Sequence, residues 1–289
     1  MSSTFSWQCK NRTIPLGEHT CVMGILNATP DSFSDGGQFG DLSCALERAL
    51  EMEAQGAQII DIGGESSRPG ADPVPLKEEI QRTIPLIEKI RAHSQVIISI
   101  DTTKAEVARQ ALDAGAQIVN DISALESDPD MAKVVAQSGA GVVLMHKRGT
   151  AKTMQNNPQY NEVVEEISVY LRERIEVAEQ AGIHRSQIVL DPGIGFGKTT
   201  AHNLELLRYL PELAENNFPL LVGASRKNFI GEMTGKKNPI DRKAGSLAVA
   251  LWARSRGAHI LRVHDVIDTC EACTLLDTLL GGDYLCFRN

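Results

Sequence analysis

Short apolar runs alternate with helical patterns along most of the chain. Each run spans four or five residues and is rich in β-branched or other apolar side chains. Continuous apolar runs of this length are typical of strands buried on both faces of a parallel sheet. The eight runs are Val22–Leu26, Gln58–Ile62, Val96–Ile100, Gln117–Asn120, Gly141–Met145, Gln187–Leu190, Pro219–Gly223 and His259–Val263.

The segments between these runs carry the period of amphipathic helices. Apolar residues recur every three or four positions over residues 164–178, and Gly182 then supplies a C-terminal stop. Before another such segment, Thr103 and Glu106 have the spacing of a capping box. A third segment, residues 80–90, contains Pro85, which we expect to kink or split its helix.

The order of these elements predicts the fold class. Eight strand–helix alternations within about 260 residues match an α/β protein of the (β/α)₈ TIM-barrel type in count and length. A doubly wound open sheet is the alternative, because periodicity alone does not show closure. No linker rich in Pro or Gly divides the chain, so residues 1–289 are expected to form one domain. Residues 5–21 precede the first core strand, and we expect a short hairpin there across the bottom of the barrel.

Composition narrows the classes of protein to consider. The 289 residues are 42% hydrophobic and 23% charged, and the formal net charge is −8 without any marked basic run, so neither nucleic acid nor membrane is an expected partner. The beginning of the sequence lacks an apolar stretch after a basic start, so we expect no secretory signal. Six cysteines are too few for a disulfide scaffold in a chain of this length, which favours a reducing cytoplasm.

Polar or charged groups follow every predicted strand. In a barrel enzyme the C-terminal ends of the strands build the active site, so these groups should share one face. For any single one, a helix cap or a turn is the more ordinary explanation, but all eight strands show the feature. The groups are Asn27, Glu65-Ser66-Ser67-Arg68, Asp101, Asn120-Asp121, Met145-His146, Asp191, Ser225-Arg226-Lys227 and His264-Asp265.

Two kinds of ligand fit these strand ends. A cationic set predicts a phosphate site, because barrels often bind phosphate near strands 7 and 8. Asp101, Asn120 and Asp191 can accept hydrogen bonds from a flat heterocycle rich in N–H groups. The members of the cationic set are Arg68, Arg226, Lys227, Arg262 and His264.

Seven segments, in order along the chain, resemble the signatures of the dihydropteroate synthase family. The first two are the longest, MGILNATPDSFSDGG from Met23 and IDIGGESSRPG from Ile60. The resemblance extends from about Thr20 to the end of the chain. The other five segments are SIDT at 99–102, VND at 119–121, LDPGIGFGK at 190–198, GASRK at 223–227 and RVHD at 262–265.

The resemblance implies a reaction and a set of site residues. Members condense 6-hydroxymethyl-7,8-dihydropterin diphosphate with p-aminobenzoate, with Mg²⁺, and yield 7,8-dihydropteroate and pyrophosphate. The implied pterin pocket consists of Asp101, Asn120, Asp191 and Lys227, lined by Met145 and Phe196. The implied diphosphate site consists of Asn27, Arg68, Arg262 and His264, with Asn27 near the metal. The implied p-aminobenzoate subsite consists of Phe33, Ser67, Pro69, Ser225 and Lys227. The residues expected to act in catalysis are Asn27, Asp35, Asp101, Lys227, Arg262 and His264.

Further expectations and alternatives accompany this resemblance. Phe33 and Asp35 belong to the loop 28–40, which we expect to close over the reaction centre. Homodimers are implied through the later helices, for which residues 244–253 supply an apolar stretch. Ser67 stands where the family more often has Thr. The alternatives are a methyltransferase of the same superfamily, which passes a methyl group from a folate to a corrinoid, and an inactive pterin-binding paralogue.

Overall fold

The computed structural model describes residues 4–28, 37–214 and 217–281, and within them eight parallel strands form one sheet. Neighbouring strands follow the order β8-β7-β6-β5-β4-β3-β10-β9. Leu190 of β8 forms a parallel bridge with Leu220, which directly precedes β9, and the Leu190 N–H donates to the Pro219 carbonyl at 3.0 Å. The sheet therefore closes into the predicted barrel. The strands are β3 (Cys21–Asn27), β4 (Ile59–Gly63), β5 (Ile97–Asp101), β6 (Ile118–Asp121), β7 (Gly141–Met145), β8 (Ile188–Asp191), β9 (Leu221–Val222) and β10 (Ile260–Val263).

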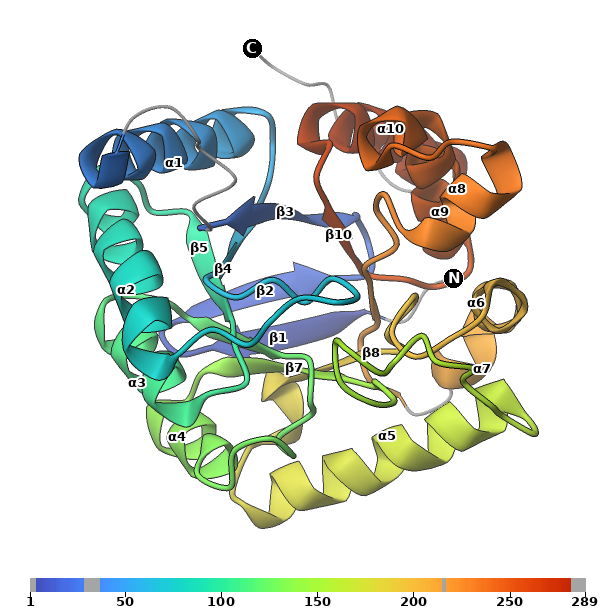
Figure 1. The fold of residues 1–289 in the computed structure, drawn as a ribbon, viewed down its shortest axis with the longest axis horizontal. Helices are drawn as coiled ribbons and strands as arrows, with labels where there is room; N and C mark the ends of the chain where they lie inside the picture. Colours follow the sequence, from blue (N-terminus) through green and yellow to red (C-terminus); the bar gives the residue numbers. More distant parts are fainter. Residues whose placement is uncertain (1–3, 29–36, 215–216, 282–289) are drawn as a thin grey trace.

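Helices surround the sheet and cover the outward side chains of its strands (Figure 1). They are α1 (Gly37–Ala54), α2 (Leu76–His93), α3 (Ala105–Asp113), α4 (Met131–Ser138), α5 (Val163–Gln180), α6 (Thr200–Arg208), α7 (Leu210–Ala214), α8 (Asn228–Thr234), α9 (Lys243–Ser255) and α10 (Val266–Leu279). Two short 3₁₀ turns, Arg185–Gln187 and Pro239–Arg242, precede β8 and α9.

The expected capping box and the expected split at Pro85 are both wrong. The capping box does not form, because α3 begins at Ala105 with Lys104 as its N-cap residue, and no side chain of its own caps it. Instead the Ala105 N–H donates to the carboxylate of Asp128 at 2.8 Å, a residue from the segment before α4. Pro85 does not split its helix, since α2 continues to His93. Leu86, Ile87 and Ile90, which all follow Pro85 and are buried, hold the second half of α2 against the barrel.

An N-terminal hairpin covers the bottom of the barrel, as expected. Its strands β1 (Phe5–Cys9) and β2 (Arg12–Leu16) pair antiparallel. Trp7 is fully buried there, and its indole N–H donates to the Gln187 carbonyl at 2.7 Å. The approach is so close that a Cβ on Gly141 would lie 2.6 Å from the Cys9 sulfur. The hairpin thus forms the floor beneath the inward side chains of the strands.

The interior of the barrel changes from apolar near the hairpin to polar near the C-terminal ends of the strands. Side chains two positions apart on a strand point to the same face. Ile59, Ile118 and Val189 belong to the apolar cluster above the hairpin. Two residues further along the same strands stand Asp61, Asn120 and Asp191, all buried. The strand period therefore places a polar layer directly above the apolar one, toward the C-terminal ends of the strands.

Candidate active site

A guanidinium from β10 lies at the centre of the polar layer. Arg262 donates from Nε to Asp61 at 2.6 Å and from Nη2 to Asp101 at 2.7 Å. The Asn120 amide donates to the same Asp61 oxygen at 3.1 Å. Asp61 is fully buried, whereas the Arg262 side chain is 18% exposed. Four strands, β4, β5, β6 and β10, thus contribute to one connected network.

Asp61 is a site residue that the sequence analysis missed. The candidates predicted from the sequence stand at the strand ends, whereas Asp61 lies in the middle of β4. The available signal was a carboxylate inside an otherwise apolar run, which needs a partner when buried. Asp61 therefore holds the Arg262 guanidinium at Nε, while Asp101 holds it at Nη2.

Burial controls the charge of the two other carboxylates. It raises the pKa of Asp101 above the ordinary value, an effect that Arg262 opposes and Asp61 reinforces. Burial likewise raises the pKa of Asp191 to about 6, although the Gly193 N–H donates to it at 2.7 Å. A cation or hydrogen-bond donor placed near Asp101 or Asp191 therefore lowers the pKa of that residue and favours its charged form.

Lys227 stands opposite these acids, at the N-terminus of α8. Its ammonium lies 3.7 Å from the centroid of the Phe196 ring, a cation–π contact. Burial and the charge of Arg262 lower the pKa of Lys227 to about 7. Among the described residues, no carboxylate lies within 4 Å of this ammonium. A ligand with electron-rich atoms would stabilise its protonated form.

The loop after β8 is organised by a second, deeper lysine. The Lys198 ammonium is buried and donates to the carbonyls of Gly193 and Phe196 at 2.9 and 3.0 Å. It also lies 2.9 Å from Nδ1 of His146, the residue that follows β7. Gly193 has φ +67°, and a Cβ there would stand 1.9 Å from the His146 carbonyl oxygen. Only glycine fits, and the loop holds Phe196 beneath Lys227.

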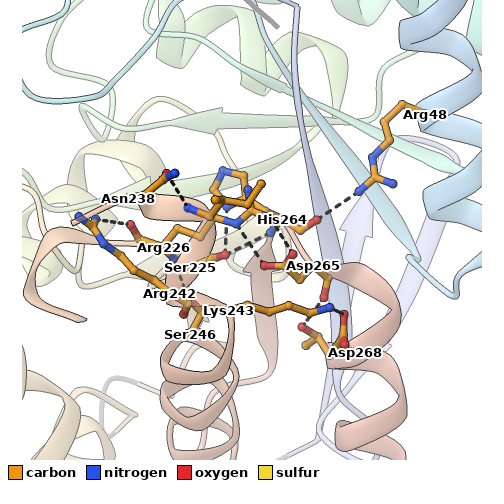
Figure 2. Close-up of polar contacts among 12 residues, drawn as sticks. Arg48, Ser225, Arg226, Asn238, Arg242, Lys243, Ser246, His264, Asp265 and Asp268 are labelled. Atoms are coloured by element: carbon orange, nitrogen blue, oxygen red, sulfur yellow. Dashed lines mark hydrogen bonds and ion pairs between the residues drawn. The ribbon is translucent and has the colours of Figure 1, made fainter. Parts of the chain in front are cut away.

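The ends of β9 and β10 meet in a third cluster. Ser225 Oγ lies 3.0 Å from Nδ1 of His264, and Arg226 binds Asp265 through two hydrogen bonds, the shorter at 2.7 Å (Figure 2). Burial, together with Arg226 and Arg262, lowers the pKa of His264 to about 3. His264 is therefore neutral at physiological pH. Of the predicted cations, His264 thus adds no charge, and that of Arg226 is compensated by Asp265.

The remaining predicted residues lie around the rim or outside the described part of the chain. Asn27 ends β3 beside Gly63 of β4, and it is partly exposed. Ser67 is partly exposed, while Arg68 and Pro69 are exposed in the loop after β4. Met145 ends β7 and packs in one buried cluster with Phe196. Phe33 and Asp35, with most of the expected lid loop 28–40, lie outside the described residues.

A separate pocket lies far from these groups. It has a volume of about 620 Å³ and is lined by residues of the hairpin turn and the ends of α2 and α3. Its cations already have partners: Arg12 donates to the Gln95 carbonyl, Lys10 to that of Leu112, and Arg91 to several acceptors. This pocket lies where the hairpin packs against the helices, and it is not part of the candidate site.

Neither a metal cluster nor a membrane-spanning helix is found among the described residues. The described part of the chain holds no group of three or more His, Cys, Asp or Glu side chains arranged around a common point for a metal ion. No helix in the described ranges is both long enough and apolar enough to cross a bilayer.

Comparisons with known proteins give a consistent result. The model of the family described as pterin binding enzyme matches residues 23–264. Dihydropteroate synthase from Synechocystis is 51% identical over 263 residues, covering 91% of each chain, and that from Escherichia coli K12 is 49% identical over 264 residues. The structure of Xanthomonas albilineans dihydropteroate synthase with 4-aminobenzoic acid superimposes with a TM-score of 0.91 at 45% identity, covering 96% of this chain and 99% of that one. These matches confirm the resemblance seen in the sequence. The chain belongs to the pterin-binding enzyme family and, within it, to the dihydropteroate synthases.

Proposed function

We propose that this chain joins 6-hydroxymethyl-7,8-dihydropterin diphosphate to p-aminobenzoate, forming 7,8-dihydropteroate and releasing pyrophosphate. The observation that carries the proposal is the polar layer at the barrel mouth, where Arg262 lies between Asp61 and Asp101. A related structure from Xanthomonas albilineans contains 7,8-dihydropteroate, at a TM-score of 0.86 and 43% identity. The same fold and the same family support the same chemistry here.

The pterin is assigned to the deepest part of the site. Asp101, Asn120 and Asp191 provide oxygen acceptors for the N–H groups of the ring, and these acceptors are buried. Met145 and Phe196 supply the apolar wall. Because an apolar wall with a few fixed polar groups is typical of small-molecule sites, this arrangement suits a flat heterocycle.

The diphosphate is assigned to the cationic side of the mouth. Arg68 provides positive charge, Arg262 provides a guanidinium whose charge is shared with Asp61 and Asp101, and the neutral ring of His264 provides a hydrogen-bond donor. Asn27 adds an amide at the end of β3. These groups stabilise the charge that grows on the leaving diphosphate as its bond to carbon breaks.

The substitution proceeds in two stages at the pterin methylene. The C–O bond breaks first, and its electron pair leaves with the diphosphate, so positive charge develops on the methylene carbon. The carboxylates of Asp101 and Asp191 stabilise this charge. The aniline nitrogen of p-aminobenzoate then forms the new C–N bond with its lone pair and afterwards loses one proton to water or to the released diphosphate. Ser67, Pro69, Ser225 and Lys227 are assigned to the aminobenzoate.

Mg²⁺ is the proposed cofactor, and Asn27 is its proposed protein ligand. An amide oxygen is a hard donor, and Mg²⁺ commonly takes only one or two protein ligands besides substrate phosphates and water. Asn27 offers one such oxygen at the partly exposed end of β3, which fits this coordination preference. When bound, Mg²⁺ would neutralise charge on the diphosphate.

We also propose that the chain forms a homodimer in the cytoplasm. Large apolar side chains are exposed on α9 and α10, which lie side by side (Figure 1). Trp252 is 42% exposed, Leu275 70% and Leu279 83%. Exposed apolar surface of this kind is typical of subunit interfaces. In analytical ultracentrifugation, Leu275→Arg should give monomers, whereas Val169→Arg on α5 should not. A monomeric wild-type protein at micromolar concentration would rule the dimer out.

A coupled assay of pyrophosphate release tests the proposed reaction. Release should require both the dihydropterin diphosphate and p-aminobenzoate, and Arg262→Gln should lower kcat/KM by at least tenfold. Release that does not depend on p-aminobenzoate would contradict the condensation. The corrinoid methyltransferase alternative needs no diphosphate site, so activity with a methylated folate in place of the pterin diphosphate would favour it.

A further inference from the structure

A cluster of three charged residues connects the segment before α3 with the loop that follows β4. The ammonium of Lys104 contacts Glu65 at 2.6 Å and also pairs closely with Glu79. Glu79 comes from the first turn of α2, and its side chain is only 1% exposed. Lys104 and Glu65 are 27% and 31% exposed. One cation therefore joins a buried carboxylate to a carboxylate at the surface of the barrel mouth.

The buried end of this cluster is held firmly. Glu79 accepts a hydrogen bond from the Thr102 hydroxyl at 2.6 Å, and Thr102 directly follows Asp101. A Cβ on Gly64 would lie 2.9 Å from the Glu79 side chain and 2.8 Å from that of Thr83. The start of the loop after β4 therefore packs directly onto α2, and Glu79 is fixed relative to β5.

The exposed end of the cluster closes the base of a loop. The same Glu65 oxygen that contacts Lys104 accepts a hydrogen bond from the Val74 N–H at 3.0 Å. One carboxylate thus ties the start of the loop to its end. The tip of the loop has its own anchor, because the Gly70 N–H donates to the Ala151 carbonyl at 2.9 Å. Between base and tip lie Ser67, Arg68 and Pro69.

We propose that Lys104 is a positioning residue for p-aminobenzoate, acting through Glu65 on the 66–69 segment; this rests on the proposed function. Without the ammonium, two carboxylates face each other near the loop base, and Glu79 cannot turn away because it is buried. Glu65 is partly exposed and turns toward water, so the Val74 N–H loses its acceptor. The 66–69 segment then samples positions that do not fit the aminobenzoate, whereas the pterin pocket keeps its geometry.

The test compares Lys104→Met with Lys104→Arg and with a matched control. The control is Arg109→Met, which removes an exposed cation of α3 whose partners are Glu106 and Asp113 on the same helix. For Lys104→Met we expect KM for p-aminobenzoate to rise about tenfold, while KM for the pterin diphosphate rises less, because that substrate keeps Arg262 and the pterin pocket when Arg68 moves with the segment, and kcat changes less than twofold. Lys104→Arg should restore most of the affinity, and the control should match the wild type.

A second measurement does not depend on turnover. Hydrogen exchange of residues 66–74 in the ligand-free protein should be faster in Lys104→Met than in wild type or Arg109→Met. If Lys104→Met does not fold, Glu65→Gln serves instead, because it keeps the Lys104–Glu79 pair and weakens the contact to the loop. An unchanged KM for p-aminobenzoate, or an equal loss in both KM values and kcat, overturns the proposal. Failure of the proposed function would appear separately, as wild-type protein without pyrophosphate release.

Discussion

Asp61→Asn is the sharpest perturbation of the candidate site, because it changes one charge at nearly constant volume. The carboxylate of Asp61 accepts hydrogen bonds from Arg262 and Asn120, and it is fully buried. Asparagine can still accept one hydrogen bond from each donor through its carbonyl oxygen. What the variant loses is the negative charge that faces the Arg262 guanidinium at 2.6 Å.

The expected loss of stability in Asp61→Asn follows from the contacts that Arg262 keeps. Arg262 keeps its second ion pair, to Asp101 at 2.7 Å, so the guanidinium is not left without a counter-charge. The loss is therefore close to one charge-assisted hydrogen bond, about 1.5–3 kcal/mol. For a chain of this size that lowers the melting temperature by roughly 2 to 5 °C. If Arg262 must keep its orientation in the transition state, kcat/KM falls by roughly 10- to 150-fold.

The pH profile provides a second readout. The charge of Asp61 is one of the causes that raise the pKa of Asp101, so its removal lowers that pKa. Asp101 acts in its charged form, and activity is lost as the pH falls through its pKa. The acidic limb of the kcat/KM profile should therefore move to lower pH in Asp61→Asn, even though the plateau is lower.

A matched pair elsewhere in the barrel separates stability from activity. Arg254 and Asp277 are both buried and form an ion pair at 2.6 Å, away from the strand ends that carry the site. Asp277→Asn should lower the melting temperature without changing the kcat/KM of the folded enzyme. The reasoning would be refuted if Asp61→Asn retained wild-type kcat/KM, if its acidic limb moved to higher pH, or if Asp277→Asn lost as much activity.

Three further outcomes are expected. Asn27→Ala should lower turnover and weaken its dependence on Mg²⁺ without unfolding the protein, and wild-type activity at limiting Mg²⁺ would exclude the metal role. Ser67→Thr adds one methyl group, worth about 0.8 kcal/mol if fully buried, so KM for p-aminobenzoate should fall up to about fourfold with kcat unchanged; equal KM values and equal sulfonamide inhibition in both proteins would make Ser67 neutral. Lys227→Met should abolish turnover but leave the melting temperature at pH 7 no lower. Because the pKa of Lys227 is about 7 in the folded chain and 10.5 ordinarily, the unfolded chain binds the extra proton between these values, so wild type should gain stability over the variant as pH rises through that window, as denaturant titrations would show.

Hydrophobic periodicity predicted the eight strands and the helices between them, because each buried strand is a short apolar run. Closure into a barrel did not follow from it and became visible only in the pairing of Leu190 with Leu220. The predicted runs and the observed strands agree to within about two residues at each end. The errors came from contacts between distant segments. The N-terminus of α3 is capped by Asp128, which no local pattern around Thr103 reveals.

The candidate site was predictable to the extent that it follows strand ends. Asp101, Asn120 and Asp191 stand where those ends predicted and share one polar layer. Asp61 was not predicted because its side chain enters this layer from the middle of β4, whereas the predicted candidates stand at the ends of their strands. The neutral state of His264 could not be predicted either, because it depends on burial and on the neighbouring cations Arg226 and Arg262.

The hairpin beneath the barrel has a consequence for the order of events during turnover. With Trp7 and its neighbours filling the lower end, the described interior communicates with solvent only through the mouth. The groups assigned to the pterin lie on the floor of that mouth, whereas Ser67 and Pro69, which are assigned to p-aminobenzoate, lie at its rim. An aminobenzoate bound first would therefore stand across the path of the larger substrate. We expect an ordered mechanism in which the pterin diphosphate binds first, and excess p-aminobenzoate slows the reaction by occupying the empty enzyme.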